Sequence, residues 1–335
     1  MAKFSIILPV KNGGKYVKEC VNSILSQNLQ DFNLIVLDNC SIDGTLEWLQ
    51  SLEDVRIKII PSNKPLTIEE NWGRIIDVQK NEFITLIGHD DILYPDFLKV
   101  VDNLINTYPG AALYHTHFNY IDAKGDKIRN SKPMSLDVKG YEFLKDFLRI
   151  SVDSMGTGYV MRSNNYDAVG GIPVRYPNLL FADFELWLNI ALKSFIVTAP
   201  ETCFAFRKHQ SVTGTSEDNK LHKALSVFID FLCSLQQKDS QAKEIIDRFG
   251  AAFLLFYCKG FSHRLLRTPK RKRDNLTVSN FIAQTKKLAL KLGIQDQYKP
   301  NRVLSIRLAG IIDRVAFLRG LFLIFKKMQP KPILD

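Results

Sequence analysis

Two adjacent carboxylates, Asp90 and Asp91, are the residues of this sequence most suited to chemistry. They lie just beyond the apolar run of residues 83–87, which predicts a buried strand. In open α/β sheets, ligands bind beyond the carboxyl ends of the strands. Neighbouring carboxylates raise each other's proton affinity unless a cation lies beside them, so a divalent metal that carries phosphate oxygens would suit the pair. In the alternative reading, Asp91 caps the helix opened by residues 94–96 and Asp90 is solvated.

Other carboxylates also stand at the ends of predicted elements. Asp38 follows a second apolar strand, residues 32–37, and therefore belongs to the same edge of the sheet as Asp90. Asp183 and Glu185 lie in the first turns of a helix expected over residues 179–192, where the helix dipole favours acidic side chains. A catalytic base is the alternative role. Residues i and i+2 of a helix lie about 200° apart around its axis, so Glu185 should point elsewhere if Asp183 faces a cleft.

Strands and helices alternate along the first two thirds of the chain, which predicts a doubly wound, mostly parallel α/β sheet. From residue 217 onward the pattern is helical, so we expect a catalytic domain over residues 1–215 and a helical extension over residues 216–335, with the boundary near residues 213–218. We predict strands over residues 4–10, 32–37, 55–60, 83–87, 111–121, 159–161 and 195–206, and helices over residues 17–29, 46–49, 68–78, 97–106, 141–150 and 179–192.

Composition narrows the class of protein. The chain has 335 residues, of which 46% are hydrophobic, as expected of a globular core. Its five cysteines are widely spaced and never form a Cys-x-x-Cys pair, so neither a disulfide framework nor a zinc site is indicated. The short apolar stretch of residues 4–10 does not resemble a signal peptide. We therefore expect a cytoplasmic protein.

Charge is distributed unevenly. Residues 251–335 hold 18 Lys and Arg against four Asp and Glu, whereas residues 1–250 hold 27 against 31. A basic appendage on an acidic body indicates a polyanionic partner, either a membrane surface or a nucleic acid. The basic cluster over residues 264–273 could also be a solvated turn. A nucleic-acid partner is not expected, because no recognition motif is present and the body is acidic.

The apolar segment of residues 303–325 is interrupted by Arg307, Asp313, Arg314 and Arg319, so it is too charged to span a bilayer. Such a helix could pack on the catalytic domain, form a dimer, or lie at a lipid interface. We favour peripheral attachment to the inner face of the plasma membrane.

Several motifs occur in a characteristic order. The stretches Ser-Ile-Ile-Leu-Pro-Val-Lys-Asn at residues 5–12, Leu-Asp-Asn-Cys-Ser-Ile-Asp-Gly-Thr at 37–45, His-Asp-Asp at 89–91, Ala-Asp-Phe-Glu-Leu-Trp-Leu at 182–188 and Arg-Lys-His at 207–209 follow one another. This arrangement, which covers about the first 210 residues, resembles the family-two inverting glycosyltransferases. The resemblance implies a GT-A fold, a nucleotide-diphosphate sugar donor such as a UDP- or dTDP-linked sugar, and Mn²⁺ or Mg²⁺.

Site residues follow from the resemblance position by position. Asp38 would contact the base, Asp90 would bind the metal with Asp91 and His209 as further candidates, and Asp183 would be the catalytic base. Residues near the nucleotide or its diphosphate would be Pro9, Val10, Asn12, Asn71, Arg74 and Arg207. Arg74 could equally form a surface salt link. Gly88 stands where the family has the first acid of its metal motif, and Asn39 replaces another acid.

The chemistry of inverting transfer needs one base. An acceptor hydroxyl attacks the anomeric carbon opposite the departing diphosphate, and a carboxylate within hydrogen-bond reach removes its proton. The acceptor would be a glycan or a lipid-linked saccharide of surface polysaccharide synthesis. A nucleotidyltransferase on a similar sheet is the alternative function. It would release pyrophosphate, whereas a glycosyltransferase releases a nucleoside diphosphate.

Overall fold

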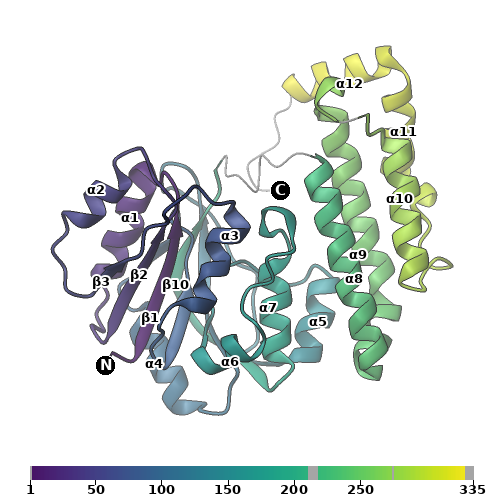
Figure 1. Cartoon of the computed structure of the whole chain (residues 1–335). Helices are drawn as coiled ribbons and strands as arrows, with labels where there is room; N and C mark the ends of the chain where they lie inside the picture. The colour runs from purple at the N-terminus through teal and green to yellow at the C-terminus, as the bar shows by residue number, and fades with distance from the viewer. Residues whose placement is uncertain (1, 210–217, 274, 329–335) are drawn as a thin grey trace. The chain divides into compact units, whose positions relative to one another are not determined.

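A computed structural model describes residues 2–209, 218–273 and 275–328 (Figure 1). The chain divides into two compact units. The first comprises Met1–Phe143 and Val152–Gly214, and the second comprises Leu144–Ser151 and Thr215–Asp335. The short segment Leu144–Ser151 thus belongs to the helical unit although it precedes much of the first unit in sequence. Most of the predicted boundary at residues 213–218 lies outside the described residues.

The described part of the first unit is built on a 10-stranded sheet. Eight of its strands follow the order β3-β2-β1-β4-β9-β6-β10-β5, and off this path β7 pairs with β6 and β8 pairs with β10. The pairs β1–β2, β1–β4, β2–β3 and β6–β10 are parallel, whereas β9 runs antiparallel to both of its neighbours. The strands are β1 (Phe4–Val10), β2 (Phe32–Asp38), β3 (Ile57–Ile59), β4 (Phe83–Leu86), β5 (Ile92–Leu93), β6 (Leu113–Ile121), β7 (Lys127–Asn130), β8 (Asp137–Lys139), β9 (Val160–Arg162) and β10 (Phe195–Arg207). The predicted mixed α/β fold with a mostly parallel sheet is confirmed.

The apolar periodicities explain the core of this unit. All residues of β1 are buried, as expected of a strand covered on both faces. Helix α1 (Gly14–Leu25) buries Val17, Cys20, Val21 and Ile24, which recur at helical spacing. The other helical segments of the first unit and its junction are α2 (Thr45–Gln50), α3 (Ile68–Gly73), η1 (Arg74–Asp77), α4 (Phe97–Thr107), α5 (Gly140–Leu148), α6 (Ser163–Ala168), η2 (Pro177–Leu179) and α7 (Ala182–Ala191).

Some predicted elements differ from the observed ones. The helix expected over residues 68–78 ends at Gly73 and continues only as the 3₁₀ turn η1. The helix expected from residue 179 begins at Ala182, because Asn178, Leu179 and Phe181 adopt left-handed backbone angles (φ +54°, +56° and +72°). Such angles are incompatible with a right-handed helix. The strand pattern of residues 195–206 is one strand, β10, with a register shift after Ala199.

The second unit is helical, as predicted. Its elements are α8 (Asp218–Lys238), α9 (Ser240–Arg267), η3 (Lys270–Lys272), α10 (Val278–Lys291), η4 (Pro300–Arg302), α11 (Leu304–Arg314) and α12 (Ala316–Met328). The prediction of one helix over residues 303–325 is wrong, because the helix breaks at Val315, where the backbone is extended. No helix in the described part of the chain is both long and apolar enough to cross a bilayer.

Candidate active site

The loops that follow β1 and β2 interlock at the carboxyl edge of the sheet. The Asn12 amide N–H donates to Ser41 Oγ at 2.9 Å, and Asn12 Oδ1 accepts from the Ile42 N–H at 2.8 Å. The Asn39 N–H donates to the Val10 carbonyl at 2.9 Å. Asn12 has a φ of +52°, which asparagine tolerates better than most residues. Val10 and Pro9 are buried in β1, so Asn12 is the member of this predicted trio that lies at the surface.

Asp38 lies fully buried at the end of β2. Its Oδ2 accepts from the Ser41 N–H at 3.2 Å. Its Oδ1 is buried and has no hydrogen-bond partner in the described part of the chain. A buried carboxylate oxygen without a partner is costly, and a ligand that supplies an N–H would remove that cost. This placement fits the prediction that Asp38 contacts a base.

Asn71 and Arg74 form hydrogen bonds to the backbone at the same end of β2. Arg74 donates to the Asp38 carbonyl at 3.1 Å, to Asn71 Oδ1 at 3.0 Å and to the Ile60 carbonyl at 2.7 Å. Asn71 is buried and donates to the Leu37 carbonyl at 3.1 Å. Both side chains therefore fix the backbone around Asp38. Their donors bond to protein acceptors, and the prediction that Asn71 and Arg74 lie near the nucleotide stays a prediction.

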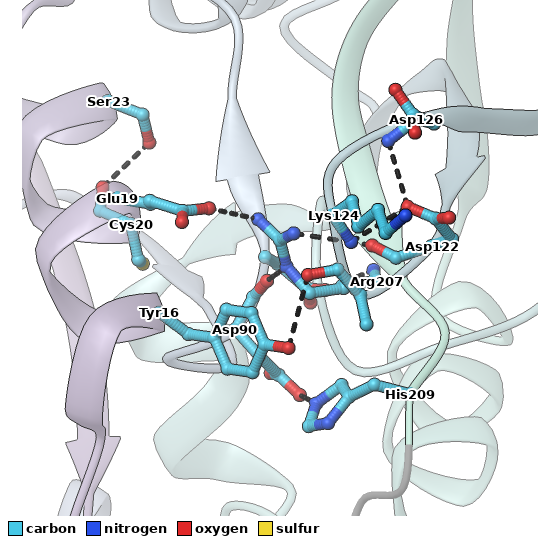
Figure 2. A network of polar contacts seen from close by, with 12 residues as sticks. Tyr16, Glu19, Cys20, Ser23, Asp90, Asp122, Lys124, Asp126, Arg207 and His209 are labelled. Atoms are coloured by element: carbon cyan, nitrogen blue, oxygen red, sulfur yellow. Dashed lines mark hydrogen bonds and ion pairs between the residues drawn. The ribbon is translucent and has the colours of Figure 1, made fainter.

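Asp90 and His209 meet although 119 residues separate them. The Asp90 Oδ2 atom lies 2.6 Å from His209 Nε2, and both side chains are partly exposed (Figure 2). The ring of Tyr16 lies beside the imidazole, with centroids 4.9 Å apart. The structure thus joins two of the three side chains that we predicted as metal ligands.

Arg207 occupies the centre of the polar network in Figure 2. Its side chain is completely buried. Nε donates to the Asp90 carbonyl at 2.8 Å, Nη2 pairs with Glu19 at 2.5 Å, and Nη1 donates to the Asp122 carbonyl at 3.3 Å. The guanidinium also lies 4.7 Å from the Tyr16 ring centroid. The prediction that Arg207 contacts phosphate oxygens is not supported by this placement, because its donors are engaged with protein acceptors.

Asp91 does not share the partner of Asp90, His209, and is bonded to other groups. It is 2% exposed, and its two oxygens accept from the Thr157 hydroxyl and from the Arg207 N–H. Burial, and then the charge of Asp90, raises the pKa of Asp91 well above its usual range. The placement supports neither the predicted metal contact nor the alternative helix cap, because α4 begins six residues later and both oxygens are occupied.

Gly88 explains how the two carboxylates fit together. A Cβ atom at this position would lie 2.8 Å from Asp90 Oδ1 and 3.3 Å from Asp91 Oδ2. Any side chain would therefore force Asp90 to move. Glycine at this position therefore leaves room for the observed orientation of the Asp90 carboxylate, whose other oxygen contacts His209.

The Asp90 and His209 donors suit a divalent metal. Mg²⁺ and Mn²⁺ commonly bind through one or two protein side chains, with phosphate oxygens and water completing the shell. Within residues 2–209, 218–273 and 275–328, no group of three or more His, Cys, Asp or Glu side chains forms a metal site. The protein would therefore supply only part of the coordination, and the donor diphosphate would supply more.

Asp183 and Glu185 behave differently although one residue separates them. Asp183 accepts from the Phe184 N–H at 2.8 Å and forms no ion pair within the described residues. Burial raises its pKa to about 6. Glu185 is 4% exposed and is bonded to Arg175 and to the Tyr176 hydroxyl. The two side chains thus have different hydrogen-bond partners, and the prediction that Asp183 rather than Glu185 faces a cleft stays a prediction.

The segment before Asp183 carries strain that the sequence did not reveal. Asn178, Leu179 and Phe181 are all left-handed, and the Asn178 N–H donates to Glu69 at 2.7 Å. Left-handed backbone in residues other than glycine costs free energy and often occurs at functional sites. Tyr16, Glu19 and Thr157 were also missed. The one-turn spacing of Tyr16 and Glu19 at the start of α1 was the available signal.

Comparisons with known proteins agree with the geometry. The sequence profile of glycosyl transferase family 2 matches residues 5–167. An uncharacterized glycosyltransferase of Rickettsia typhi is 23% identical over 249 residues, which cover 70% of this chain and 73% of the relative.

Two solved structures are similar in fold. The crystal structure of S. aureus TarS in complex with UDP-GlcNAc aligns with a TM-score of 0.69 at 16% identity, covering 98% of this chain and 92% of that chain. The mannosyltransferase PcManGT from Pyrobaculum calidifontis, in complex with GDP-Man and Mn²⁺, aligns with a TM-score of 0.53 at 13% identity, covering 94% of this chain and 88% of that chain. The predicted GT-A fold is confirmed.

Proposed function

Because the chain belongs, through residues 5–167, to glycosyl transferase family 2 and is a glycosyltransferase, we propose that it transfers a sugar with inversion from a nucleotide-diphosphate donor to a hydroxyl of a glycan or lipid-linked saccharide. The observation that carries this proposal is Asp183, a carboxylate that has no cationic partner within the described residues and whose pKa burial raises to about 6. A carboxylate with a pKa near the working pH is suited to accept a proton during the reaction.

The donor base is recognised by Asp38. Its buried Oδ1 has no partner in the described residues, so it is ready to accept the N–H of a uracil or thymine ring. The interlocked loops that contain Asn12 and Ser41 hold this carboxylate in place before the nucleotide arrives. We therefore propose a UDP- or dTDP-linked sugar as donor. The UDP-GlcNAc complex of the similar TarS structure supports a uridine nucleotide.

The diphosphate end of the donor lies near Asp90 and His209. These two side chains would hold a divalent Mn²⁺ or Mg²⁺ ion, and such an ion, when bound, neutralises charge on the departing diphosphate. The Mn²⁺ in the similar PcManGT structure supports this assignment. Arg207 fixes the backbone of Asp90 through its Nε donor, so the carboxylate keeps its orientation toward His209. Arg207 is therefore a positioning residue.

The transfer step needs only the chain's own base. Asp183 accepts the proton of the acceptor hydroxyl while the acceptor oxygen forms a bond to the anomeric carbon. The bond from that carbon to the diphosphate oxygen breaks, and the electron pair leaves with the nucleoside diphosphate. No covalent enzyme intermediate is required, so the sugar inverts in one displacement.

Residues 1–215 would form the catalytic domain and residues 216–335 a helical extension. We place the enzyme in the cytoplasm, in surface polysaccharide synthesis, because nucleotide sugars are cytoplasmic metabolites and all five cysteines are free thiols. A lipid-linked acceptor would bring the reaction to the inner face of the plasma membrane. The net charge of +10 and its concentration in the last 85 residues support contact with anionic lipids.

The proposal is tested first by ligand binding. We expect UDP or dTDP to raise the melting temperature with Mn²⁺ and to raise it much less without the metal, because only ligands of the folded state stabilise it. Asp90→Ala should remove the metal-dependent part of the shift. Absence of any shift with UDP, dTDP or GDP would contradict the nucleotide site.

Turnover then identifies the reaction. Released nucleotide is analysed by chromatography, and the anomeric configuration of the product by NMR. A nucleoside diphosphate and an inverted anomer are expected. Release of pyrophosphate would instead identify a nucleotidyltransferase, and a retained anomer would exclude Asp183 as the sole base.

A further inference from the structure

Helix α11 carries an exposed apolar stripe. Leu304, Leu308 and Ile311 are 44–59% exposed and recur every three or four residues, so they share one face. Val315, just past the end of the helix, is 44% exposed. The opposite side of the helix buries Ile306 and Ala309 against the rest of the second unit. Side chains of this size are not normally left exposed in a row without a partner.

Helix α12 continues this apolar surface. None of its residues is buried. Five large apolar side chains, spaced at one-turn intervals, are 49–77% exposed: Phe317, Leu321, Ile324, Phe325 and Met328. Arg319 bonds to the carbonyls of Leu266 and Thr268 at 3.3 Å and 2.9 Å, which ties α12 across the end of α9 (Figure 1). The helix is therefore held in place while its apolar face stays open.

A basic groove borders the stripe. Two adjoining hollows of about 390 Å³ each lie between α10, η4 and α11, and they share Lys286 and Asn301. Their linings contain no acidic residue. The basic side chains that line them are Lys286, Lys299, Arg302, Arg307 and Arg314, and none forms an ion pair within the described residues.

The geometry of α11 places charge next to the apolar stripe. Arg307 and Arg314 are two turns apart and lie roughly a quarter turn from the stripe around the helix axis. Basic side chains that flank an exposed apolar stripe are typical of helices that lie in a lipid interface, where the stripe enters the acyl region and the cations contact the phosphates.

We propose that α11, α12 and the adjoining groove form a docking face for a membrane surface that contains anionic phospholipids. The proposal deepens the proposed function, since it names the surface that brings the enzyme to a lipid-linked acceptor. Charge complementarity favours an anionic lipid surface as the partner of this basic face. A second copy of the chain would bring five like charges together, and a nucleic acid would leave the exposed apolar stripe without a favourable contact.

Vesicle flotation tests this docking face without any sugar donor or acceptor. The full chain is mixed at low salt with phosphatidylcholine vesicles that contain or lack phosphatidylglycerol. We expect binding to the anionic vesicles only, and weaker binding at high salt, because the electrostatic attraction is screened. Binding that is equal on both vesicle types, or absent on both, would overturn the proposal. Because no donor is present, this failure is distinct from a failure of the transferase assay.

Two variants separate the charged and apolar parts. Arg307→Gln/Arg314→Gln should lower the partition coefficient by about 25-fold, since each basic side chain near an anionic surface contributes roughly a factor of five. Phe317→Ser/Leu321→Ser should also release the protein from vesicles while leaving the Arg pair intact. Arg314 Nε donates to Ser279 Oγ at 3.2 Å, and the side chains of Arg307, Phe317 and Leu321 form no hydrogen bond within the described residues. Both variants should therefore keep the wild-type melting temperature.

The matched control is Lys220→Gln/Lys223→Gln on α8, which removes the same charge from exposed positions outside the docking face. It should change the partition coefficient by less than the Arg307/Arg314 variant. An equal loss in the control would show that net charge alone is responsible and would overturn the proposed face. The proposed face would also be overturned if both test variants floated with the vesicles as well as the wild type does. It would likewise be overturned if the protein ignored vesicles but bound duplex DNA, and the same variants weakened that DNA binding.

Discussion

Arg207 in the first unit and Arg273 in the second are both buried arginines beside a carboxylate, but they use their donors differently. Arg273 pairs with Asp313 at 2.7 Å, and both side chains are almost completely buried. The remaining oxygen of Asp313 accepts from the Val278 N–H. Arg207 instead donates to the Glu19 carboxylate and to main-chain carbonyls, one of which is that of Asp90. The Asp90 carboxylate is thus left to His209 and to a ligand.

The same contrast occurs within one helix. Glu185 is enclosed by Arg175 and Tyr176, whereas Asp183 has no cationic partner among the described residues. A buried carboxylate that is paired with a cation contributes to architecture, as Glu185 does with the half-exposed Arg175. A carboxylate whose backbone is fixed but whose oxygens have no cationic partner can accept a proton or bind a ligand.

The largest expected effect is that of Asp183→Asn. The rate of sugar transfer should fall by about 10²- to 10⁴-fold because the base is lost, while donor affinity stays near that of the wild type. Steady-state kinetics and donor titration measure the two quantities. The matched control is Glu185→Gln, which should reduce stability but leave the rate per folded molecule within a few-fold. Equal rate losses in both variants would erase the distinction between the two carboxylates.

Arg273→Met should destabilise the protein by about 3–5 kcal/mol, because it leaves Asp313 as a buried charge without a partner. Urea unfolding measures the loss. Arg273→Met/Asp313→Asn should recover much of it, since the amide oxygen still accepts the Val278 N–H and no charge remains buried. Donor binding by the folded protein should not change. Weak donor binding in the stabilised double variant would mean that Arg273 is not purely architectural.

Arg207→Lys should weaken metal-dependent donor binding by about 10- to 100-fold, the usual range for a residue that supports a metal ligand. Lysine keeps the charge but cannot reach Glu19 and two carbonyls at once. Manganese titration of UDP binding measures the effect. Metal-independent nucleotide binding should be unchanged. If metal-dependent and metal-independent nucleotide binding weaken together, Arg207 supports the whole loop rather than Asp90 alone.

Asp38→Asn should lower donor affinity by about tenfold, because a charged hydrogen bond to the base is replaced by a neutral one. The preference for UDP over other nucleotides should weaken as well. Isothermal titration with UDP, dTDP and GDP tests this expectation. The free protein should be no less stable than the wild type, since Asp38 Oδ1 has no hydrogen-bond partner to lose among the described residues.

The smallest expected effect is on the pH dependence of stability. Burial raises the pKa of Asp183 from 3.8 to about 6, so the folded state holds this proton more tightly than the unfolded state. The contribution of Asp183 to stability is full below the unfolded pKa and is lost as the pH rises through the folded pKa. Asp183→Asn should therefore gain about 1–2 kcal/mol relative to the wild type between pH 4 and 7. A constant difference across this range would contradict a raised pKa.

Much of the catalytic geometry was accessible from sequence because it depends on local periodicity. The two apolar runs place Asp38 and Asp90 at strand ends, and the helical repeat separates Asp183 from Glu185. The inward turn of Asp91 was not accessible, because it depends on Thr157, which lies 66 residues away. The break at Val315 was also missed, since neither proline nor glycine marks it.

The sequence alone determined seven strands of the sheet, their order along the chain, and the set of carboxylates that could act, because strand and helix repeats are properties of neighbouring residues. The short strands β5, β7 and β8 were not predicted. Only the tertiary structure decided which of these carboxylates stay open. That choice depends on cations brought from distant parts of the chain, such as Arg207, which meets the Glu19 carboxylate across 188 residues. It also depends on desolvation, which acts on a side chain only after the fold has closed around it.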